Sequence, residues 1–261
     1  MGTVGKALEL LDVFTRSRPL IGLSDLARLA QLNKATCFRL VQELCDYGLL
    51  EQVGSSREYR LGPSVLRLAA QREAQVPTRD AAMPILQELA NATGETAHMS
   101  LIMASVLRPL AVAYSTAYAT RVTMEDTDSL PFHATSSGLA VLAFQSEAFV
   151  AAQLDKPLVK LAVRTETNPA NLRDRLAHIT KSGVAESAGA YETDVNSMAV
   201  PLFDAFGSCI GAVSVAAIAS RQSSEQITHT RATLIQAGRK ITKLWGGSVP
   251  PAIATAWQTA A

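Results

Sequence analysis

Apolar residues recur every three or four positions along the first 75 residues, which is the spacing of an amphipathic helix. This spacing predicts a helix over residues 3–15 and a second helix that starts at Leu23-Ser24-Asp25, with Ser24 as its N-cap. After a three-residue break, a third helix is predicted from Lys34 to about Tyr47, with Asn33 as its N-cap. Two helices separated by so short a break are typical of a helix-turn-helix.

Two short strand-like segments follow the third helix. Residues 49–53 and 57–61 flank the turn Gly54-Ser55-Ser56, and this arrangement predicts a β-hairpin. A hairpin directly after a helix-turn-helix indicates a winged helix. A further helix is predicted from Ser64 to about Gln75, where it would link this domain to the next.

From residue 80 the pattern changes to longer alternations of helix and strand. The expected helices cover residues 80–92, the segment from His133 through Phe144, 169–181 and 223–244. The expected strands lie near residues 97–103, 110–116, 183–187, 196–203 and 209–217. The predicted domains are therefore a winged helix over 1–63, a linker helix over 64–78, a larger domain over 79–246, and a flexible Pro/Ala-rich tail over 247–261.

Composition narrows the class of protein. With 48% hydrophobic and 18% charged residues in 261, the chain can bury a core, while its net charge of +1 gives no overall signature of nucleic-acid binding. The three cysteines have no metal-ligand spacing, and they are expected to be small buried residues of a reduced protein. No signal peptide or membrane-spanning run is recognised. We therefore expect a cytoplasmic protein without membrane, metal or cofactor.

The third predicted helix divides into two faces. The inward face repeats at steps of three, four and seven residues and comprises Cys37, Leu40, Val41 and Leu44. The outward face comprises Lys34, Ala35, Thr36, Phe38, Arg39 and Gln42.

The outward residues have the chemistry of a groove reader. Lys34 and Thr36 can meet phosphate near the positive end of the helix dipole, and Arg39 and Gln42 can reach base edges. Phe38 can contact a thymine methyl group or a sugar. Arg57 and Arg60 lie on the hairpin, where a wing would touch the DNA backbone or minor groove. The same pattern also fits a small helical bundle with a solvated charged face.

These segments, together with several downstream, resemble the IclR family of bacterial transcriptional regulators. The matching segments are Gly5-Lys6-Ala7-Leu8-Glu9-Leu10-Leu11, Leu23-Ser24-Asp25-Leu26-Ala27, Asn33-Lys34-Ala35-Thr36-Cys37-Phe38-Arg39-Leu40, Tyr59-Arg60-Leu61-Gly62, Thr93-Gly94-Glu95-Thr96-Ala97-His98, Leu130-Pro131-Phe132-His133-Ala134-Thr135-Ser136-Ser137-Gly138, Ala199-Val200-Pro201-Leu202-Phe203-Asp204 and Gly211-Ala212-Val213-Ser214-Val215. The resemblance implies an α+β protein whose second domain is a GAF-like α/β effector-binding domain with a curved sheet. It also implies homodimers or homotetramers that bind double-stranded DNA operators.

A candidate effector site lies where a loop becomes a helix at Ser136 and Ser137, because unpaired backbone amides there attract anions. The resemblance implies that small acids bind in this region, alongside Leu130, Ser187, Ser197 and Ser214, with Ala119 and Val122 as apolar lining. Many relatives carry an acidic residue at the position of Ser187 and a cysteine at that of Ser197. The pocket expected here is thus polar but uncharged, suited to a hydroxy acid, a keto acid or a lactone. Ser197 and Ser214 could equally be ordinary strand or cap hydroxyls, whereas for Ser136 and Ser137 a role in binding is favoured over that alternative. His98 is expected to be a satisfied core residue.

Two other classes of function stay open at this point. One is an enzyme fused to a DNA-binding domain, although GxSxG, HExxH and P-loop motifs are all missing from the sequence. The other is a scaffold whose winged helix binds protein. The reading that the residues favour is a DNA-binding transcriptional regulator controlled by a small-molecule effector, whether repressor or activator.

Overall fold

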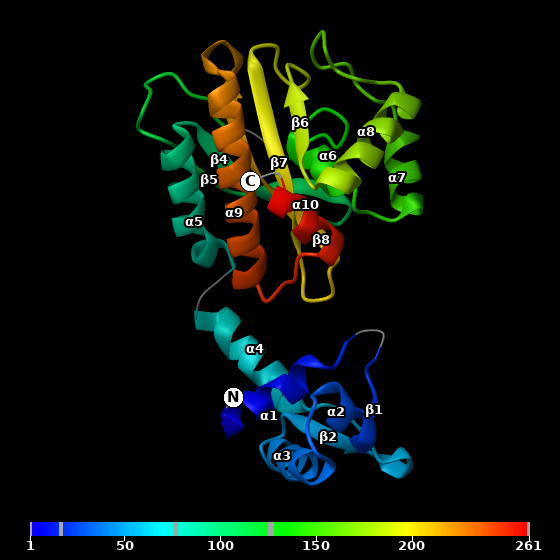
Figure 1. Cartoon of the computed structure of the whole chain (residues 1–261). Coiled ribbons are helices and arrows are strands. Elements are labelled where there is room, and N and C mark those ends of the chain that lie inside the picture. The colour runs from blue at the N-terminus through cyan, green and yellow to red at the C-terminus, as the bar shows by residue number, and fades with distance from the viewer. Residues whose placement is uncertain (1, 16–17, 76–77, 125–127, 260–261) are drawn as a thin grey trace. The chain divides into compact units, whose positions relative to one another are not determined.

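The computed structural model describes residues 2–15, 18–75, 78–124 and 128–259. The chain divides into two compact units, Met1–Pro77 and Thr78–Ala261 (Figure 1). No helix of the described residues has the length and apolar content needed to cross a membrane.

The first unit is a helix-turn-helix followed by a hairpin, as predicted. Its elements are α1 (Thr3–Asp12), β1 (Ile21–Gly22), α2 (Leu23–Leu29), α3 (Lys34–Asp46), β2 (Leu50–Val53), a 3-10 turn η1 (Gly54–Ser56), β3 (Glu58–Leu61) and α4 (Pro63–Gln75). The short strand β1 adds to the hairpin and gives an antiparallel sheet of order β1-β3-β2. Two residues are too few to show a period in the sequence, so this strand was not predicted.

The two predicted helix caps have different outcomes. Asn33 caps α3 as expected, because its side-chain oxygen accepts the Thr36 amide at 2.8 Å. Ser24 as the cap of α2 is wrong: the helix already begins at Leu23, and extended Gly22 is the N-cap residue. The reason is that pairing with β3 holds Gly22 in an extended conformation up to the first helical residue.

The second unit is a five-stranded antiparallel sheet covered by helices. Its strands are β4 (Thr96–Met103), β5 (Val106–Ala113), β6 (Ala185–Ala188), β7 (Val195–Phe203) and β8 (Cys209–Ile218), in the order β5-β4-β8-β7-β6. Its helices are α5 (Thr78–Thr93), α6 (Ser136–Leu142), α7 (Glu147–Leu154), α8 (Pro169–Ser182), α9 (Ser224–Leu244) and α10 (Pro251–Thr259), with a 3-10 turn η2 (Ala219–Arg221). All five predicted strands are present, although β5 begins earlier than expected, and α7 was not predicted.

Opposite faces of the sheet carry different helices. Helix α9 lies side by side with α5 against the sheet (Figure 1), so close that a side chain on Gly238 would meet Val200 Cγ2 at 2.6 Å. Val200 pairs with Val213 of β8. Since successive strand residues point to opposite faces, the next residue, Ser214, faces α6 instead. Its hydroxyl lies 3.1 Å from that of Ser136 in α6.

The prediction of a flexible tail over 247–261 is wrong for the described part of that segment, while residues 260–261 lie outside the described residues. Residues Pro251–Thr259 form α10, in which Ile253 and Trp257 are buried. The indole Nε1–H of Trp257 donates to the Gly183 carbonyl at 3.2 Å, and the Arg239 guanidinium lies over the ring at 5.5 Å. Two apolar residues four apart in a Pro/Ala-rich segment carry little periodic signal, and only the packing against α8 reveals the helix.

We predict that Trp257→Ala lowers the unfolding free energy of the second unit by about 3–5 kcal/mol, because the substitution leaves a cavity under α10. Urea unfolding followed by circular dichroism measures the change. Gln258→Ala, at an exposed position of the same helix, is the matched control and should change stability by less than about 0.5 kcal/mol. Equal stability of both variants would mean that α10 does not contribute to the core.

Candidate functional site

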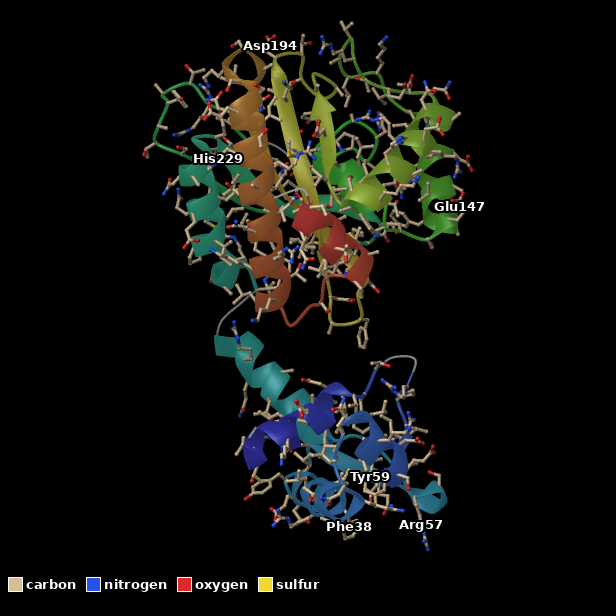
Figure 2. All side chains as sticks on the ribbon, in the orientation of Figure 1. Phe38, Arg57, Tyr59, Glu147, Asp194 and His229 are labelled. Carbon is tan, nitrogen blue, oxygen red and sulfur yellow. The ribbon has the colours of Figure 1, made fainter. Side chains whose placement is uncertain are left out.

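Helix α3 separates its residues into the two predicted faces. Cys37, Leu40, Val41 and Leu44 are buried. Lys34, Ala35, Phe38, Arg39 and Gln42 are exposed, and Thr36 is half-buried. Phe38 is 48% exposed and lies on the outer side of the unit (Figure 2). An aromatic ring held in water on a rigid, otherwise polar helix face is a candidate contact residue.

The hairpin presents its two arginines differently. Arg57 has a left-handed backbone (φ 56°) after η1, projects outward in Figure 2, and its carbonyl accepts the Gln52 amide at 3.1 Å. Arg60 is paired across the hairpin with Glu51, Nε to Oε1 at 2.5 Å. Because a carboxylate already neutralises Arg60, Arg57 is the more available of the two for a phosphate group.

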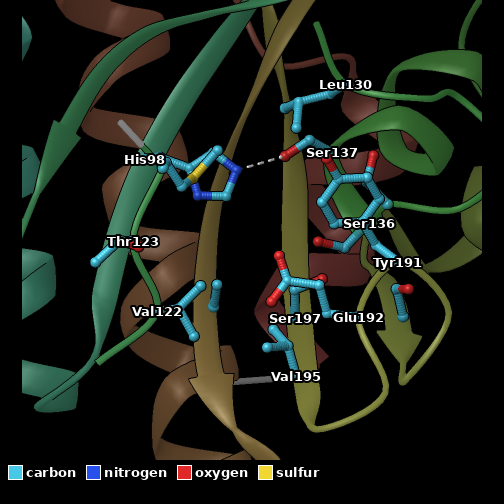
Figure 3. A pocket seen from close by; sticks show the side chains of 14 residues that line it. His98, Val122, Thr123, Leu130, Ser136, Ser137, Tyr191, Glu192, Val195 and Ser197 are labelled. Atoms are coloured by element: carbon cyan, nitrogen blue, oxygen red, sulfur yellow. Dashed lines mark hydrogen bonds between the residues drawn. The ribbon is translucent and has the colours of Figure 1, made fainter. Parts of the chain in front are cut away.

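The second unit contains a partly enclosed pocket at the start of α6 (Figure 3). It is lined by His98, Val122, Thr123, Met124, Leu130, Thr135, Ser136, Ser137, Ser187, Tyr191, Glu192, Val195, Ser197 and Ala216. The centre of a water molecule can occupy about 50 Å³ of this space. That is room for several water molecules, or for a small metabolite in their place.

Six of the eight predicted effector-site residues come together in this lining: Val122, Leu130, Ser136, Ser137, Ser187 and Ser197. Ser214 and Ala119 do not. Ser214 is completely buried on β8 and lies behind the lining, where its hydroxyl is 3.1 Å from that of Ser136. Ala119 is exposed on the surface of its loop.

The start of α6 is held by hydroxyl groups. Thr135 caps the helix by accepting the Gly138 amide at 3.0 Å, and it donates to the Pro131 carbonyl at 2.8 Å. Ser187 donates to the Ala134 carbonyl at 2.8 Å. The first hydrogen bond within the helix is that of the Leu139 amide, so those of residues 136 and 137 are not used inside α6.

His98 differs from the expectation of a satisfied core residue. It lies on the pocket wall, only 5% exposed, with Nε2 3.2 Å from the Ser137 hydroxyl (Figure 3). Its Nδ1 is buried without a hydrogen-bond partner among the described residues. Burial lowers the pKa of the ring from 6.5 to about 4. The imidazole is therefore neutral at pH 7, with one nitrogen left for a ligand or a water molecule.

The pairing of His98 with Ser137 has the residue types of a catalytic base and its nucleophile, but the other features of a catalytic site are not found among the described residues. A catalytic imidazole is oriented by a third group, whereas no described residue hydrogen-bonds to Nδ1 of His98. An imidazole whose pKa is about 4 is also a weak base at neutral pH. Among the described residues, no three His, Cys, Asp or Glu side chains are grouped to hold a metal ion.

A partly buried ion pair fixes the loop that forms one wall of the pocket. Arg221 donates to both carboxylate oxygens of Glu95, at 2.8 and 3.3 Å, and to the Thr120 carbonyl at 2.7 Å. Its guanidinium also stacks on the Tyr118 ring at 4.3 Å. Nearby, Thr96 Oγ1 donates to the Val122 carbonyl at 2.7 Å. These contacts hold residues 118–122 against the strands, next to the lining residues 122–124.

Sequence reasoning missed the lining residues His98, Thr123, Met124, Thr135, Tyr191, Glu192, Val195 and Ala216. Strand register explains part of this. Ser187, Ser197 and Ala216 pair in one row across β6, β7 and β8, and the next strand continues this row with Thr96. His98 lies two residues beyond Thr96, on the same face. The alternation of side chains along each strand indicates which residues share a face of the sheet. Only the pairing between strands shows which residues of β6, β7, β8 and β4 lie next to one another in one row.

Two family models match the chain. One, described as the bacterial transcriptional regulator IclR C-terminal domain, matches residues 73–243, and the IclR helix-turn-helix domain matches residues 3–54. The crystal structure of a protein assigned as an IclR transcriptional regulator from Silicibacter sp. TM1040 is 48% identical. Its TM-score is 0.87, over 97% of this chain and 99% of that one.

Two further relatives are more distant. The HTH-type transcriptional regulator XynR of Escherichia coli K12 is 27% identical over 258 residues, covering 94% of this chain and 97% of its own. An IclR homologue from Microbacterium hydrocarbonoxydans, solved with 4-hydroxybenzoate, is 24% identical, with a TM-score of 0.58 over 94% of this chain and 99% of that one. At that identity the likeness shows the fold alone. The curated relatives are transcriptional regulators, not enzymes.

We predict that Arg221→Ala lowers the unfolding free energy of the second unit by on the order of 3 kcal/mol, because it leaves Glu95, whose side chain is 8% exposed, without its partner. Arg173→Ala breaks an ion pair with exposed Glu147 and should cost less than about 1 kcal/mol. Both tryptophans, Trp245 and Trp257, belong to the second unit, so their fluorescence during urea unfolding reports on this unit. Similar losses in the two variants would argue against a special role for Arg221.

We also predict that His98 makes the second unit less stable in acid. The folded-state pKa of about 4 lies below the unfolded value of about 6.5, so the unfolded chain takes up the proton first as the pH falls. The contribution of neutral His98 is complete above pH 6.5 and decreases by on the order of 3 kcal/mol towards pH 4. Urea unfolding of the wild type and His98→Asn at pH 7, 5.5 and 4.5 measures the difference. A stability difference that is the same at every pH would contradict burial of the neutral ring.

Proposed function

Because this chain belongs to the IclR family of bacterial transcriptional regulators, we propose that α3 and the β2–β3 hairpin contact an operator and that a ligand in the pocket of the second unit controls this contact. The DNA-binding and effector-binding domains are properties of the family. The residues involved, the effector and the assembly are the proposal. The observation that carries it is an exposed polar helix face in a helix-turn-helix, in a chain that also contains a pocket with an unsatisfied polar group.

On the DNA side, the roles follow from position along α3. Lys34 and Thr36 stand at the positive end of the helix dipole, which favours phosphate contacts. Arg39 and Gln42, one turn further on, have the bidentate groups that recognise guanine and adenine edges. Gln42 lies beside the Tyr59 side chain of β3, and its amide has donors and acceptors for a base.

Two other groups extend this surface. Exposed Phe38 would exchange water for a thymine methyl group or a sugar. Arg57 on the wing would meet a backbone phosphate, and Ala35 allows close approach of the helix to the groove. Arg60 would contribute less, because Glu51 already neutralises it.

On the effector side, we propose a small hydroxy acid, keto acid or lactone in the pocket beside Ser136, Ser137, Ser187 and Ser197. The buried hydroxyls and the neutral ring of His98 support a small polar ligand. Val122 and Leu130 supply apolar contacts. A relative with this fold is complexed with 4-hydroxybenzoate, which supports a small-molecule ligand without identifying the one bound here.

We further propose that the chain acts as a homodimer or homotetramer. Val4 and Leu8 of α1 and Leu66 of α4 are 74%, 54% and 76% exposed, and large apolar side chains grouped in one small unit favour self-association. Two helix-turn-helix units would then read two operator half-sites. The effector would act by binding one arrangement of the assembly more tightly than another, since equal affinity for both would shift nothing.

We predict that the purified chain binds an operator duplex selected from a random DNA pool. Its affinity should fall by about a thousandfold between 50 and 200 mM salt if six phosphates are contacted. Arg39→Ala should weaken binding by about tenfold or more, because a bidentate base contact is lost. Arg173→Ala, in the second unit, is the control and should bind like the wild type. Fluorescence anisotropy of a labelled duplex measures all three.

Failure of the folded protein to bind any duplex at low salt would overturn the proposed DNA function. Salt-independent capture of a protein partner would instead favour a scaffold, because no counterions would be released from phosphates.

A further inference from the structure

The imidazole of His98 has a hydrogen-bond partner at one nitrogen only. Its Nε2 lies 3.2 Å from the Ser137 hydroxyl, the contact drawn as a dashed line in Figure 3. Its Nδ1 is buried and has no partner among the described residues. Because burial lowers the pKa of the ring to about 4, the ring is neutral at pH 7 and carries a single N–H hydrogen. The nitrogen that carries this hydrogen decides what Ser137 can offer to a ligand.

The surroundings of the ring favour the hydrogen on Nε2. With the hydrogen on Nδ1, the bare Nε2 would accept from Ser137, and the buried Nδ1–H would point at atoms that cannot accept it. With the hydrogen on Nε2, this N–H donates to Ser137 Oγ, and Nδ1 is a buried acceptor without a donor. Among buried backbone groups, an N–H without a partner is rarer than a carbonyl that is only partly satisfied, which indicates that the unpaired donor is the costlier of the two.

A donor at Nε2 leaves the hydrogen of the Ser137 hydroxyl unused. The hydroxyl accepts from His98, and this contact is its one hydrogen bond to a described residue. Ser137 lines the pocket, so its hydrogen is available to a ligand. Ser187 has the opposite character, because it donates its hydrogen to the Ala134 carbonyl and can only accept from a ligand.

A ligand carboxylate in this pocket depends on neutral donors. None of the fourteen described residues that line the pocket is a lysine or an arginine. The backbone amides of residues 136 and 137 are not used inside α6, and the Ser137 hydroxyl adds a side-chain donor beside them. Hydrogen bonds to an ionised carboxylate are stronger than those between neutral groups, so the direction of this one hydrogen affects the affinity for an acid.

We infer that His98 is a positioning residue of the effector site, whose Nε2–H holds the Ser137 hydroxyl as a hydrogen-bond donor to a carboxylate oxygen of the effector. The inference rests on the proposed function of the pocket, and it adds the residue that sets the direction of this hydrogen bond. A ring with the opposite tautomer would take up the Ser137 hydrogen, and Ser137 would then present only lone pairs to the carboxylate. His98 thus acts on the ligand through Ser137 and without charge.

The first test locates the ring hydrogen in the ligand-free, full-length protein. Magic-angle-spinning NMR of the sedimented chain, with histidine labelled by 13C and 15N, separates protonated from bare ring nitrogens by their 15N shifts. Nδ1 is identified by its bond to Cγ. The chain has four histidines, and the signals of His98 are those that disappear in His98→Gln. We expect a protonated Nε2 and a bare Nδ1 at pH 7, and a bare Nε2 would overturn the inference whatever ligand the pocket binds.

The second test measures affinity by calorimetric titration of the full-length chain. The panel contains the 2-hydroxy and 2-keto acids of two to five carbon atoms and 4-hydroxybenzoate, and the acid that binds most tightly is the probe. Ser137→Ala should weaken its binding by about tenfold, because a hydrogen bond to a charged group is lost. His98→Met should weaken it by about fivefold, because the Ser137 hydroxyl is then free to turn to a backbone carbonyl of the preceding turn.

Two further variants separate positioning from direct contact. His98→Gln carries an amide N–H that can take the place of Nε2–H, so it should bind the probe like the wild type. The double variant His98→Met/Ser137→Ala should bind no more weakly than Ser137→Ala alone, because His98 acts through Ser137. Tryptophan fluorescence confirms that each variant is folded. Additive losses in the double variant, wild-type affinity in His98→Met, or binding of none of these acids to the wild type would overturn the inference.

The same proteins separate this inference from the proposed function. The operator duplex is titrated with the wild type and with His98→Met, each with increasing amounts of the probe acid. If the acid alters operator binding at the same concentration in both proteins, the effector-controlled regulator stands and the positioning role falls. If the affinities for the acid follow the expected order but operator binding does not respond, the positioning role stands and the proposed control of the operator falls.

Discussion

The register of strand β8 is the constraint on which the second unit depends. Val213 pairs with Val200 and packs under α9, while Ser214 pairs with His98 on one side and Ala199 on the other, facing α6. A shift of one residue would exchange these faces, placing the serine in the apolar core and the valines in the pocket. The central position of β8, between β4 and β7, holds it on both edges. The same pairing therefore specifies the core and the polar site together.

The pocket is built from groups that the protein satisfies only in part. The hydroxyls of Thr135 and Ser187 hydrogen-bond to backbone groups around the start of α6 and hold that segment in place. His98 has a hydrogen-bond partner at Nε2 but none among the described residues at Nδ1, although a buried polar atom without a partner is costly. Folding stability alone would favour an apolar residue there. A ligand that completes the hydrogen bonding gains what the protein leaves unsatisfied, and this is the physical basis for a selective site.

The two units use polar side chains for opposite purposes. On α3 the polar face is exposed and hydrated, and its residues can rearrange to follow a groove. At the inner end of the pocket the polar groups are buried, and the Arg221–Glu95 pair anchors the adjoining loop. Affinity for DNA would come mainly from charge and counterion release, and discrimination among ligands from hydrogen-bond complementarity. A regulator needs both, because operator affinity must respond to a small molecule that carries little binding energy of its own.

The sequence by itself determined the features that depend on residues close together in the chain. The two faces of α3, its cap at Asn33, the hairpin and the presence of the five strands all follow from local periodicity and local hydrogen bonding. Tertiary structure alone decided which distant residues meet. In the tertiary structure His98 and Glu192 line the pocket, and Ser214 lies behind the lining against Ser136. The hydrogen bond from Trp257 to Gly183 holds the C-terminal helix α10 in place. These outcomes depend on strand register and on packing between segments that can lie more than a hundred residues apart in the chain. Neither produces a periodic pattern in the sequence.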